Sequence, residues 1–204
     1  MSSFAVVGVS AGGCYAAACA ALIPGRLSGV AIVSCGALAE YNWAERPGTE
    51  KEWSPEERAQ FELAQHDPEA AARLAAEQAA DRFDQLVEHP DLIHEELEAA
   101  EGDRWFFENN ANTAIFDAHI REAYRQGVDA FKWELIDVLQ PWGFRLADIP
   151  IPVSIWHGAQ DPRVEQQQID FQASIISKSS VVIWPDSGHM GYVKHWGDML
   201  EALV

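Results

Sequence analysis

Hydrophobic and polar positions follow one pattern near the two ends of this chain and another in its middle. Short apolar, β-branched runs predict buried strands at residues 4–7, 27–35, 151–157 and 181–184. Blocks of small or helically spaced apolar residues predict helices at 14–23, 164–176 and 195–203. Strands that alternate with helices favour a parallel sheet, so we expect an α/β fold with about four parallel strands and flanking helices.

The middle of the chain shows helical start signals and no strand-like run. The sequence SPEE at 54–57 is a capping box, and Asp67 before Pro68 starts a second helix in the same way. The apolar face of that second helix would be formed by Ala72, Ala76, Ala79, Phe83, Leu86 and Val87. Further helices are expected at 92–99, 113–126 and 128–139. The predicted organisation is a core formed by 1–39 and 148–204, interrupted by an all-helical insertion at 40–147.

Composition places the chain among globular proteins and excludes several classes of function. Its 204 residues are 48% hydrophobic, enough for a full core, and no apolar run reaches the length that spans a membrane. The formal net charge of −18 would repel nucleic acids and anionic membrane surfaces, so neither is expected as a partner. The N-terminus lacks the basic flank and cleavage site of a secretory signal, which favours a cytoplasmic location.

Two conspicuous groups of residues have ordinary structural explanations. Cys14, Cys19 and Cys35 are odd in number, lie in apolar surroundings and form no CxxC pair, which favours reduced, buried thiols. A concentration of acidic residues in the helical region is expected to form a solvated face: Glu95, Glu96, Glu98, Glu101 and Asp103.

Ser10 lies in the sequence GVSAG at 8–12, between the first predicted strand and the first predicted helix. This GxSxG pattern is typical of a tight turn in which glycines accommodate a strained backbone that presents the serine hydroxyl clear of the sheet. The backbone N–H of Ala11 would open the helix and could stabilise negative charge on an attacked carbonyl oxygen. The pattern predicts that Ser10 is a nucleophile. The alternative is an ordinary strand-to-helix turn, which can have the same sequence pattern.

A nucleophilic serine needs a base, and the base needs a carboxylate that fixes its tautomer. Reactive groups of open parallel sheets collect at the carboxyl ends of strands, which favours His189 as the base and Asp161 as the acid. Asp186 is the rival acid, but it shares the short loop of His189. The other histidines have structural or solvated interpretations: His66, His89, His94 and His119 on predicted insertion helices, His157 at a strand end, and His195 in the last helix.

The motifs GVSAGG, HGAQDPRV and SGHMGY resemble those of the α/β-hydrolase family with a helical cap, in the family's chain order Ser, Asp, His. This resemblance implies that Ser10 is the nucleophile, Asp161 the acid, His189 the general base and Ala11 one oxyanion donor. It also implies that the insertion is a cap above the active site. Aromatic residues could then line an apolar substrate pocket, with Trp105, Phe106, Trp133 and Trp142 as candidates, although core packing is the alternative explanation.

The strands that members of the α/β-hydrolase family place before the serine motif have no counterpart ahead of that motif in this sequence. Family members place about four strands and a second oxyanion donor before the nucleophile strand, where this sequence has only Met1 to Ser3. Loss of one donor would cost roughly a hundredfold to a thousandfold in rate. The first strand would also become an exposed hydrophobic edge, so we expect a homodimer or a partner chain at that edge.

The sequence therefore predicts a serine hydrolase that cleaves a small-molecule carboxylic ester or related acyl substrate through an acyl-enzyme, without a metal or organic cofactor. The alternative is a weakly active or inactive truncated hydrolase that acts as a remnant or as a self-associating interaction module.

Overall fold

The computed structural model describes residues 3–36, 59, 62–63, 66–89, 100–139 and 142–203. The predicted capping box at 54–57, the predicted helix at 92–99 and His94 lie outside these residues. Between residues 34 and 152, every regular element that the structure describes is an α-helix or a 3₁₀ helix.

The core is a parallel sheet of four strands in the order β1-β2-β3-β4. The strands span Phe4–Val9 (β1), Leu27–Val33 (β2), Val153–Gly158 (β3) and Ser179–Trp184 (β4). Val9 pairs with Val33, Val33 with Trp156, and Trp156 with Val182, so the carboxyl ends of the strands meet at one edge of the sheet. This arrangement confirms the α/β fold class predicted from the alternation of strands and helices.

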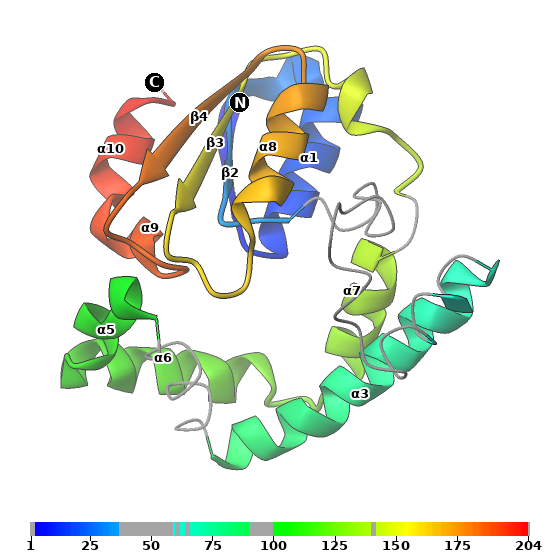
Figure 1. Ribbon diagram of the computed structural model, residues 1–204, viewed down its shortest axis with the longest axis vertical. Helices are drawn as coiled ribbons and strands as arrows, with labels where there is room; N and C mark the ends of the chain where they lie inside the picture. The colour runs from blue at the N-terminus through cyan, green and yellow to red at the C-terminus, as the bar shows by residue number, and fades with distance from the viewer. Residues whose placement is uncertain are drawn as a thin grey trace.

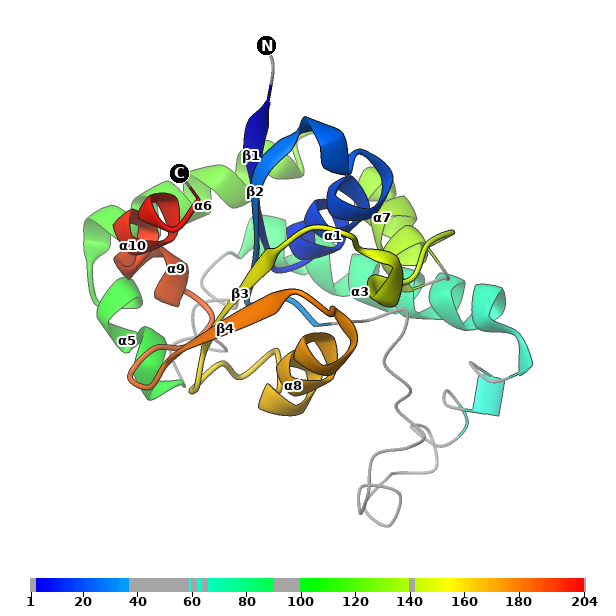
Figure 2. The same ribbon diagram turned by 90° about the horizontal axis from the view of Figure 1, so that it is seen from above.

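Helices cover both faces of this sheet (Figures 1 and 2). One face carries α1 (Gly12–Leu22) and α8 (Gln166–Ile175), and the other carries α9 (Gly191–Lys194) and α10 (Trp196–Glu201). Short 3₁₀ turns at Pro24–Arg26 (η1) and Leu146–Asp148 (η3) precede β2 and β3. Helix α10 confirms the helix predicted at 195–203, whereas the short helix α9, which ends just before His195, was not predicted.

Side chains of β2 and β3 alternate between the two helical layers. Ile32 and Ile155 belong to the cluster under α1 and α8, whereas Val33 and Trp156 pack with Met199 of α10. Since β2 is buried on both faces, nearly all of its residues must be apolar. This burial explains the long apolar run from which the strand was predicted.

The helical segment between β2 and β3 consists, in the described residues, of α3 (Pro68–Glu88), α5 (Glu101–Phe107), α6 (Asn110–Ala123) and α7 (Asp129–Leu139). Ala72 and Ala76 of α3 pack against Ile136 of α7, as the predicted apolar face of α3 requires. In Figure 1 the segment arcs past the carboxyl ends of β3 and β4, with α5 next to α9. No described helix is long and apolar enough to cross a membrane.

Candidate active site

Ser10 occupies a tight turn between β1 and α1. Its backbone is left-handed, with φ of +53°, a conformation that residues other than glycine adopt at a cost of roughly 1–3 kcal/mol. A Cβ on Gly8 would stand 2.6 Å from the Gly12 carbonyl carbon and 2.8 Å from the Ala16 Cβ, so the turn requires glycine at position 8. A Cβ on Gly12 would meet open space, so the second glycine of the motif has no such steric requirement.

Two backbone hydrogen bonds and a close helix contact hold the turn. The Ser10 N–H donates to the Val33 carbonyl (2.9 Å), and the Gly13 N–H donates to the Ser10 carbonyl (2.9 Å). A Cβ on Gly13 would stand 2.6 Å from Cys35 Sγ, so α1 presses closely on the end of β2. Within the described residues the Ala11 N–H has no hydrogen-bond acceptor, which leaves this donor available at the start of α1.

Asp161 lies in the loop that follows β3, and its carboxylate is fully buried. Its Oδ1 accepts backbone N–H groups of Arg163 (2.8 Å) and Val164 (3.1 Å). Its Oδ2 lies 2.8 Å from Nδ1 of His189. The carboxylate is therefore fixed by the backbone of its own loop and directs one oxygen at the histidine.

His189 lies in the loop that follows β4, with its side chain 10% exposed. The hydrogen bond to Asp161 requires a proton on Nδ1, which leaves Nε2 as the nitrogen that can accept a proton. The loops after β3 and β4 are also joined by their backbones, because Ala159 N–H donates to the Trp184 carbonyl (2.9 Å) and Gln160 N–H to the Ser187 carbonyl (3.0 Å).

The structure thus brings two of the predicted catalytic residues into direct contact and places the third at the same edge of the sheet. Ser10 follows β1, Asp161 follows β3 and His189 follows β4, and these strands are parallel and in register. Within the described residues no hydrogen bond joins Ser10 to His189. The participation of Ser10 in a trio with His189 and Asp161 therefore remains a prediction.

The rival candidates lie elsewhere or have other partners. Asp186 is exposed, and so are His66, His89 and His119. His195 stacks on Trp184, with ring centroids 4.7 Å apart. His157 is 1% exposed, and its Nδ1 lies 3.8 Å from Asp161 Oδ2, too far for a hydrogen bond. Burial lowers the pKa of His157, which favours the neutral ring beside the acid.

The four aromatic residues predicted to line a substrate pocket lie in three different places. Phe106 is 6% exposed and packs edge-on against Trp105, in a cluster with Phe107 and Met190. Trp133 of α7 is exposed, with the Arg73 guanidinium 5.7 Å from its ring centre. Trp142 lies beside α1, where it donates to the Val138 carbonyl. Core packing therefore explains Phe106 better than a pocket does.

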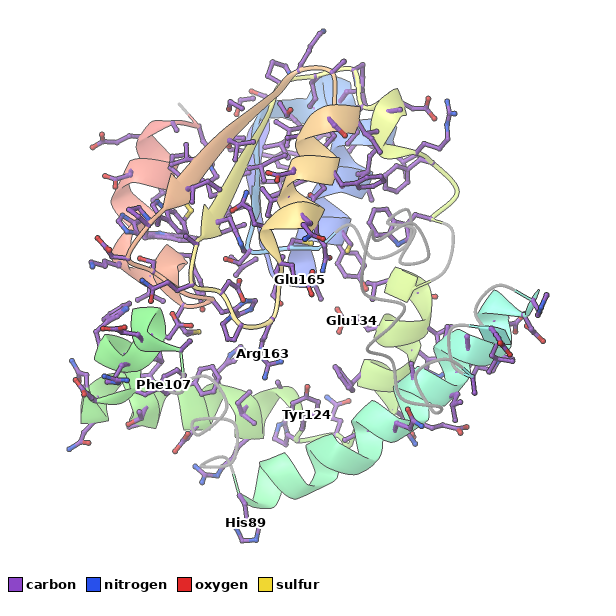
Figure 3. All side chains as sticks on the ribbon, viewed as in Figure 1. His89, Phe107, Tyr124, Glu134, Arg163 and Glu165 are labelled. Atoms are coloured by element: carbon purple, nitrogen blue, oxygen red, sulfur yellow. The ribbon has the colours of Figure 1, made fainter. Side chains whose placement is uncertain are left out.

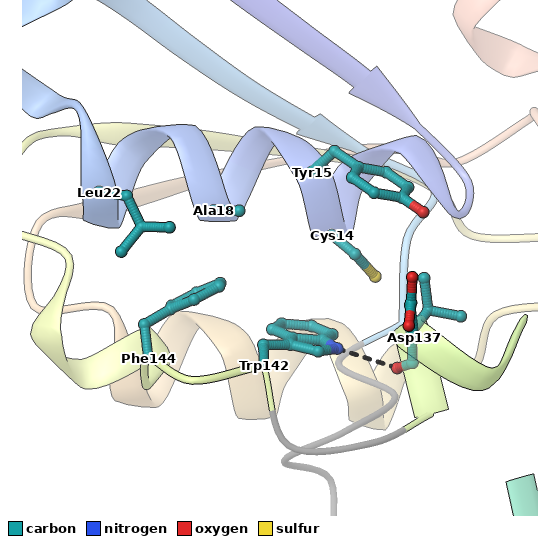
Figure 4. Close-up of a pocket in the computed structure, with 8 residues that line it drawn as sticks. Cys14, Tyr15, Ala18, Leu22, Asp137, Trp142 and Phe144 are labelled. Carbon is teal, nitrogen blue, oxygen red and sulfur yellow. Dashed lines mark hydrogen bonds between the residues drawn. The ribbon is translucent and has the colours of Figure 1, made fainter. Parts of the chain in front are cut away.

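A cavity of about 280 Å³ runs along α1 (Figure 4). Its lining residues are Cys14, Tyr15, Ala18, Leu22, Asp137, Val138, Trp142 and Phe144. The lining is mostly apolar and carries one carboxylate, so it suits an apolar ligand better than an anion. Within the described residues, no group of three or more His, Cys, Asp or Glu side chains could hold a metal ion.

Polar side chains also face the region between the core and the helical segment. Figure 3 shows Arg163, from the loop of Asp161, and Glu134, from α7, reaching toward this region. Burial, together with the charge of Glu134, raises the pKa of Tyr124 to about 12.

Asp103 is a residue that the sequence reasoning misplaced. The expected solvated acidic face included it, but Asp103 is 0% exposed and accepts the backbone N–H groups of His189 (2.7 Å) and Met190 (2.9 Å). Helix α5, which carries it, was also missed. Nothing in the local pattern separates Asp103 from its exposed acidic neighbour Glu101, so no sequence signal could have found this contact.

Comparisons with known proteins agree with the observed fold. A family model described as alpha/beta hydrolase fold matches residues 2–195, so this chain belongs to the α/β-hydrolase fold family. No curated protein matches the chain. The resemblance inferred from the three motifs is thereby confirmed at the level of the family.

Solved structures with the same fold share little sequence with this chain. A candidate non-heme bromoperoxidase, BpoC, from Mycobacterium tuberculosis H37Rv is 16% identical, with a TM-score of 0.60 over 98% of this chain and 64% of that one. A hydrolase from Pseudomonas aeruginosa PA01 is 19% identical, with a TM-score of 0.56 over 97% and 61%. A proline iminopeptidase from Mycobacterium smegmatis is 20% identical, with a TM-score of 0.51 over 100% and 64%. The chain spans less than two thirds of the length of these relatives, and the likeness concerns the fold alone.

Proposed function

We propose that this protein is a serine hydrolase that cleaves a carboxylic ester or a related small acyl compound through an acyl-enzyme. The observation that carries the proposal is the buried Asp161–His189 pair at the sheet edge that also presents Ser10 in a left-handed turn. Strained serines at strand-to-helix turns and carboxylate-oriented histidines are the two halves of a nucleophilic serine site.

In the proposed reaction, the Ser10 hydroxyl oxygen bonds to the carbonyl carbon while His189 Nε2 takes the hydroxyl proton. The carbonyl oxygen becomes an oxyanion that the Ala11 N–H stabilises. The bond to the leaving alkoxide then breaks, and His189 returns the proton to give an alcohol and acyl-Ser10. Water, deprotonated by His189, attacks the acyl group, and the carboxylic acid leaves as Ser10 regains its proton.

Asp161 keeps its charge throughout this cycle. Its hydrogen bond to Nδ1 fixes the tautomer that leaves Nε2 free to accept the serine proton, and its charge stabilises the imidazolium that then forms. The two backbone N–H groups that it accepts at Oδ1 hold the carboxylate in this orientation.

A fluorophosphonate probe and a short-chain nitrophenyl ester test the proposal on the full chain. We expect the probe to label Ser10, identified by mass spectrometry, and we expect both labelling and ester hydrolysis to vanish in Ser10→Ala. Ser34→Ala is the matched control, because Ser34 also has a left-handed backbone (φ +45°) at the end of the neighbouring strand but is fully buried. Labelling that persists in Ser10→Ala, or a folded protein that neither reacts with the probe nor hydrolyses the ester, would refute the proposal.

A second candidate function is an interaction module that associates through β1. The supporting observation is that, in the described residues, β1 pairs with β2 on one side only, while Phe4 and Ala5 are exposed. An unpaired strand edge can bind the edge of a second copy or of another chain. This candidate and the hydrolase are compatible, since the exposed residues Phe4 and Ala5 lie at the start of β1, whereas Ser10 follows its carboxyl end.

A further inference from the structure

The carboxylate of Asp103 is a buried charge outside the proposed catalytic trio. It comes from α5 of the helical segment, yet it contacts a loop of the core, 86 residues further along the chain. Each of its two oxygens accepts one backbone hydrogen bond. Oδ2 accepts the His189 N–H at 2.7 Å, and Oδ1 accepts the Met190 N–H at 2.9 Å. Both distances are those of strong, charge-assisted hydrogen bonds.

The main chain of α5 packs directly against the main chain of the His189 loop, with a glycine on each side of the contact. A Cβ on Gly102 would stand 2.6 Å from the Gly188 nitrogen, and a Cβ on Gly188 would stand 2.6 Å from the Asp103 carboxyl carbon. Phe106, one turn after Gly102, packs against Met190. The main chains of α5 and of the His189 loop are therefore in direct contact at these two glycines.

A buried carboxylate is a costly way to satisfy two backbone N–H groups. Burial raises the pKa of Asp103, whereas the two N–H groups and His189 act in the opposite direction. Within the described residues no lysine or arginine forms an ion pair with Asp103. What relates Asp103 to the reaction is its position, because its carboxylate accepts the backbone N–H of the residue proposed as the general base.

We propose that Asp103 is a positioning residue of the His189 loop. Its carboxylate holds the His189 and Met190 N–H groups so that the imidazole stays on Asp161, and its charge favours the imidazolium that forms when Nε2 takes a proton. This inference rests on the proposed function for its catalytic consequence, but its geometric half concerns the free protein. Through this contact the helical segment acts on the reaction without touching the substrate.

The test compares Asp103→Asn with the wild type and with Asp186→Asn, which removes the same charge from an exposed position in the same loop. Asparagine has nearly the shape of aspartate, but its amide nitrogen would face a backbone N–H and lose that hydrogen bond. The first readout is the pair of ring ¹⁵N shifts of His189 at neutral pH, assigned by their loss in His189→Gln. We expect a nearly pure Nδ1–H tautomer in the wild type and in Asp186→Asn, and a mixture of tautomers in Asp103→Asn.

The second readout is the hydrolysis of a nitrophenyl ester. We expect kcat of Asp103→Asn to fall by roughly tenfold to a hundredfold, as expected when a change away from the chemistry displaces a reacting group, with KM little changed. The ring shifts do not depend on activity, so an inactive wild type would contradict the proposed function while the shifts still decide the role of Asp103.

Several results would overturn the inference. A folded Asp103→Asn protein with the wild-type ring shifts would show that the contact does not position His189, even if its stability had fallen. If Asp103→Asn does not fold, Asp103→Ser, which keeps one acceptor and relieves packing, takes its place with the same expected shifts. If neither variant folds, Asp103 is a folding determinant and not a positioning residue.

Discussion

Gly158, the last residue of β3, lies against the backbone of Ser187 so closely that a Cβ on Gly158 would stand 2.7 Å from the Ser187 carbonyl carbon. The same Cβ would overlap the carbonyl oxygen of Gly188. This glycine therefore allows the loop of Asp161 and the loop of His189 to touch, and the 2.8 Å hydrogen bond between the two side chains depends on that approach.

Gly158→Ala should consequently separate the two loops. The added methyl group meets backbone atoms, which cannot rotate away, so we expect a loss of roughly 1–3 kcal/mol in the free energy of unfolding, measured with urea. We also expect a weaker Asp161–His189 hydrogen bond, visible in the ring ¹⁵N shifts of His189.

Gly197→Ala is the control for this substitution. Gly197 lies inside α10, where a Cβ would meet nothing within 4 Å, so alanine should raise stability by roughly 0.5–1 kcal/mol. Equal stability of Gly158→Ala and the wild type would contradict the packing argument.

We expect different effects on kcat from replacing Asp161 and Asp186 by asparagine. The carboxylate of Asp161 accepts a hydrogen bond from His189 Nδ1–H, whereas the amide nitrogen of asparagine can donate to Nδ1. Asp161→Asn should therefore leave the fold intact but favour the His189 tautomer that carries its proton on Nε2. A serine protease with the equivalent change loses about 10⁴ in kcat, and we expect a loss of that order in ester hydrolysis here.

Asp186→Asn should retain most of the wild-type rate, because the Asp186 side chain is exposed and lies outside the Asp161–His189 pair. Stopped-flow or steady-state assays with one nitrophenyl ester compare the two variants directly. A larger loss in Asp186→Asn than in Asp161→Asn would show that the orienting acid has been misassigned.

The features that the sequence predicted well are those whose cause is local. The β-branched run of β2 and the GVSAG turn with its Gly8 requirement depend on residues next to one another in the chain. The Asp161–His189 pair was also predictable, because parallel strands deliver their following loops to one edge of the sheet.

The features that the sequence could not predict depend on contacts between distant segments. Asp103 and Glu101 are both acidic residues of α5, and only the packing of α5 on the His189 loop buries one and exposes the other. Trp105 and Trp133 have the same side chain, but the fold places Trp105 in an aromatic cluster and Trp133 at the surface. Hydrophobicity alone does not specify which element a buried face meets.

His157 provides a prediction about stability and pH. Burial lowers the pKa of His157 below its ordinary value of 6.5, with the charge of Asp161 acting in the opposite direction. As the pH falls below 6.5, the unfolded chain binds a proton at this residue that the folded chain does not bind. The stabilisation that this residue contributes above that pH is therefore lost on acidification.

We expect the wild type to lose more unfolding free energy than His157→Gln between about pH 7.5 and pH 5.5, up to about 1.4 kcal/mol per unit of pKa shift. Urea unfolding at several pH values measures the difference between the two proteins, in which the contributions of titrating groups that do not interact with His157 cancel. Parallel stability profiles for the two proteins would show that His157 binds protons equally in the folded and unfolded states.

The last prediction is that the protein associates in solution through the edge of β1. Phe4 is 38% exposed, Ala5 is exposed, and in the described residues β1 hydrogen-bonds only to β2. An unpaired, apolar edge of this kind gains backbone hydrogen bonds and buries hydrophobic surface when it meets a second copy. We therefore expect a mass above that of the monomer at micromolar concentration, by sedimentation velocity.

Ala5→Lys should reduce this association, because a charged side chain on an edge strand disfavours strand pairing. Ala123→Lys, at the exposed end of α6, adds the same charge far from the edge and should leave the association unchanged. A wild type that sediments as a monomer, or equal association of the two lysine variants, would show that the edge of β1 is not an interface.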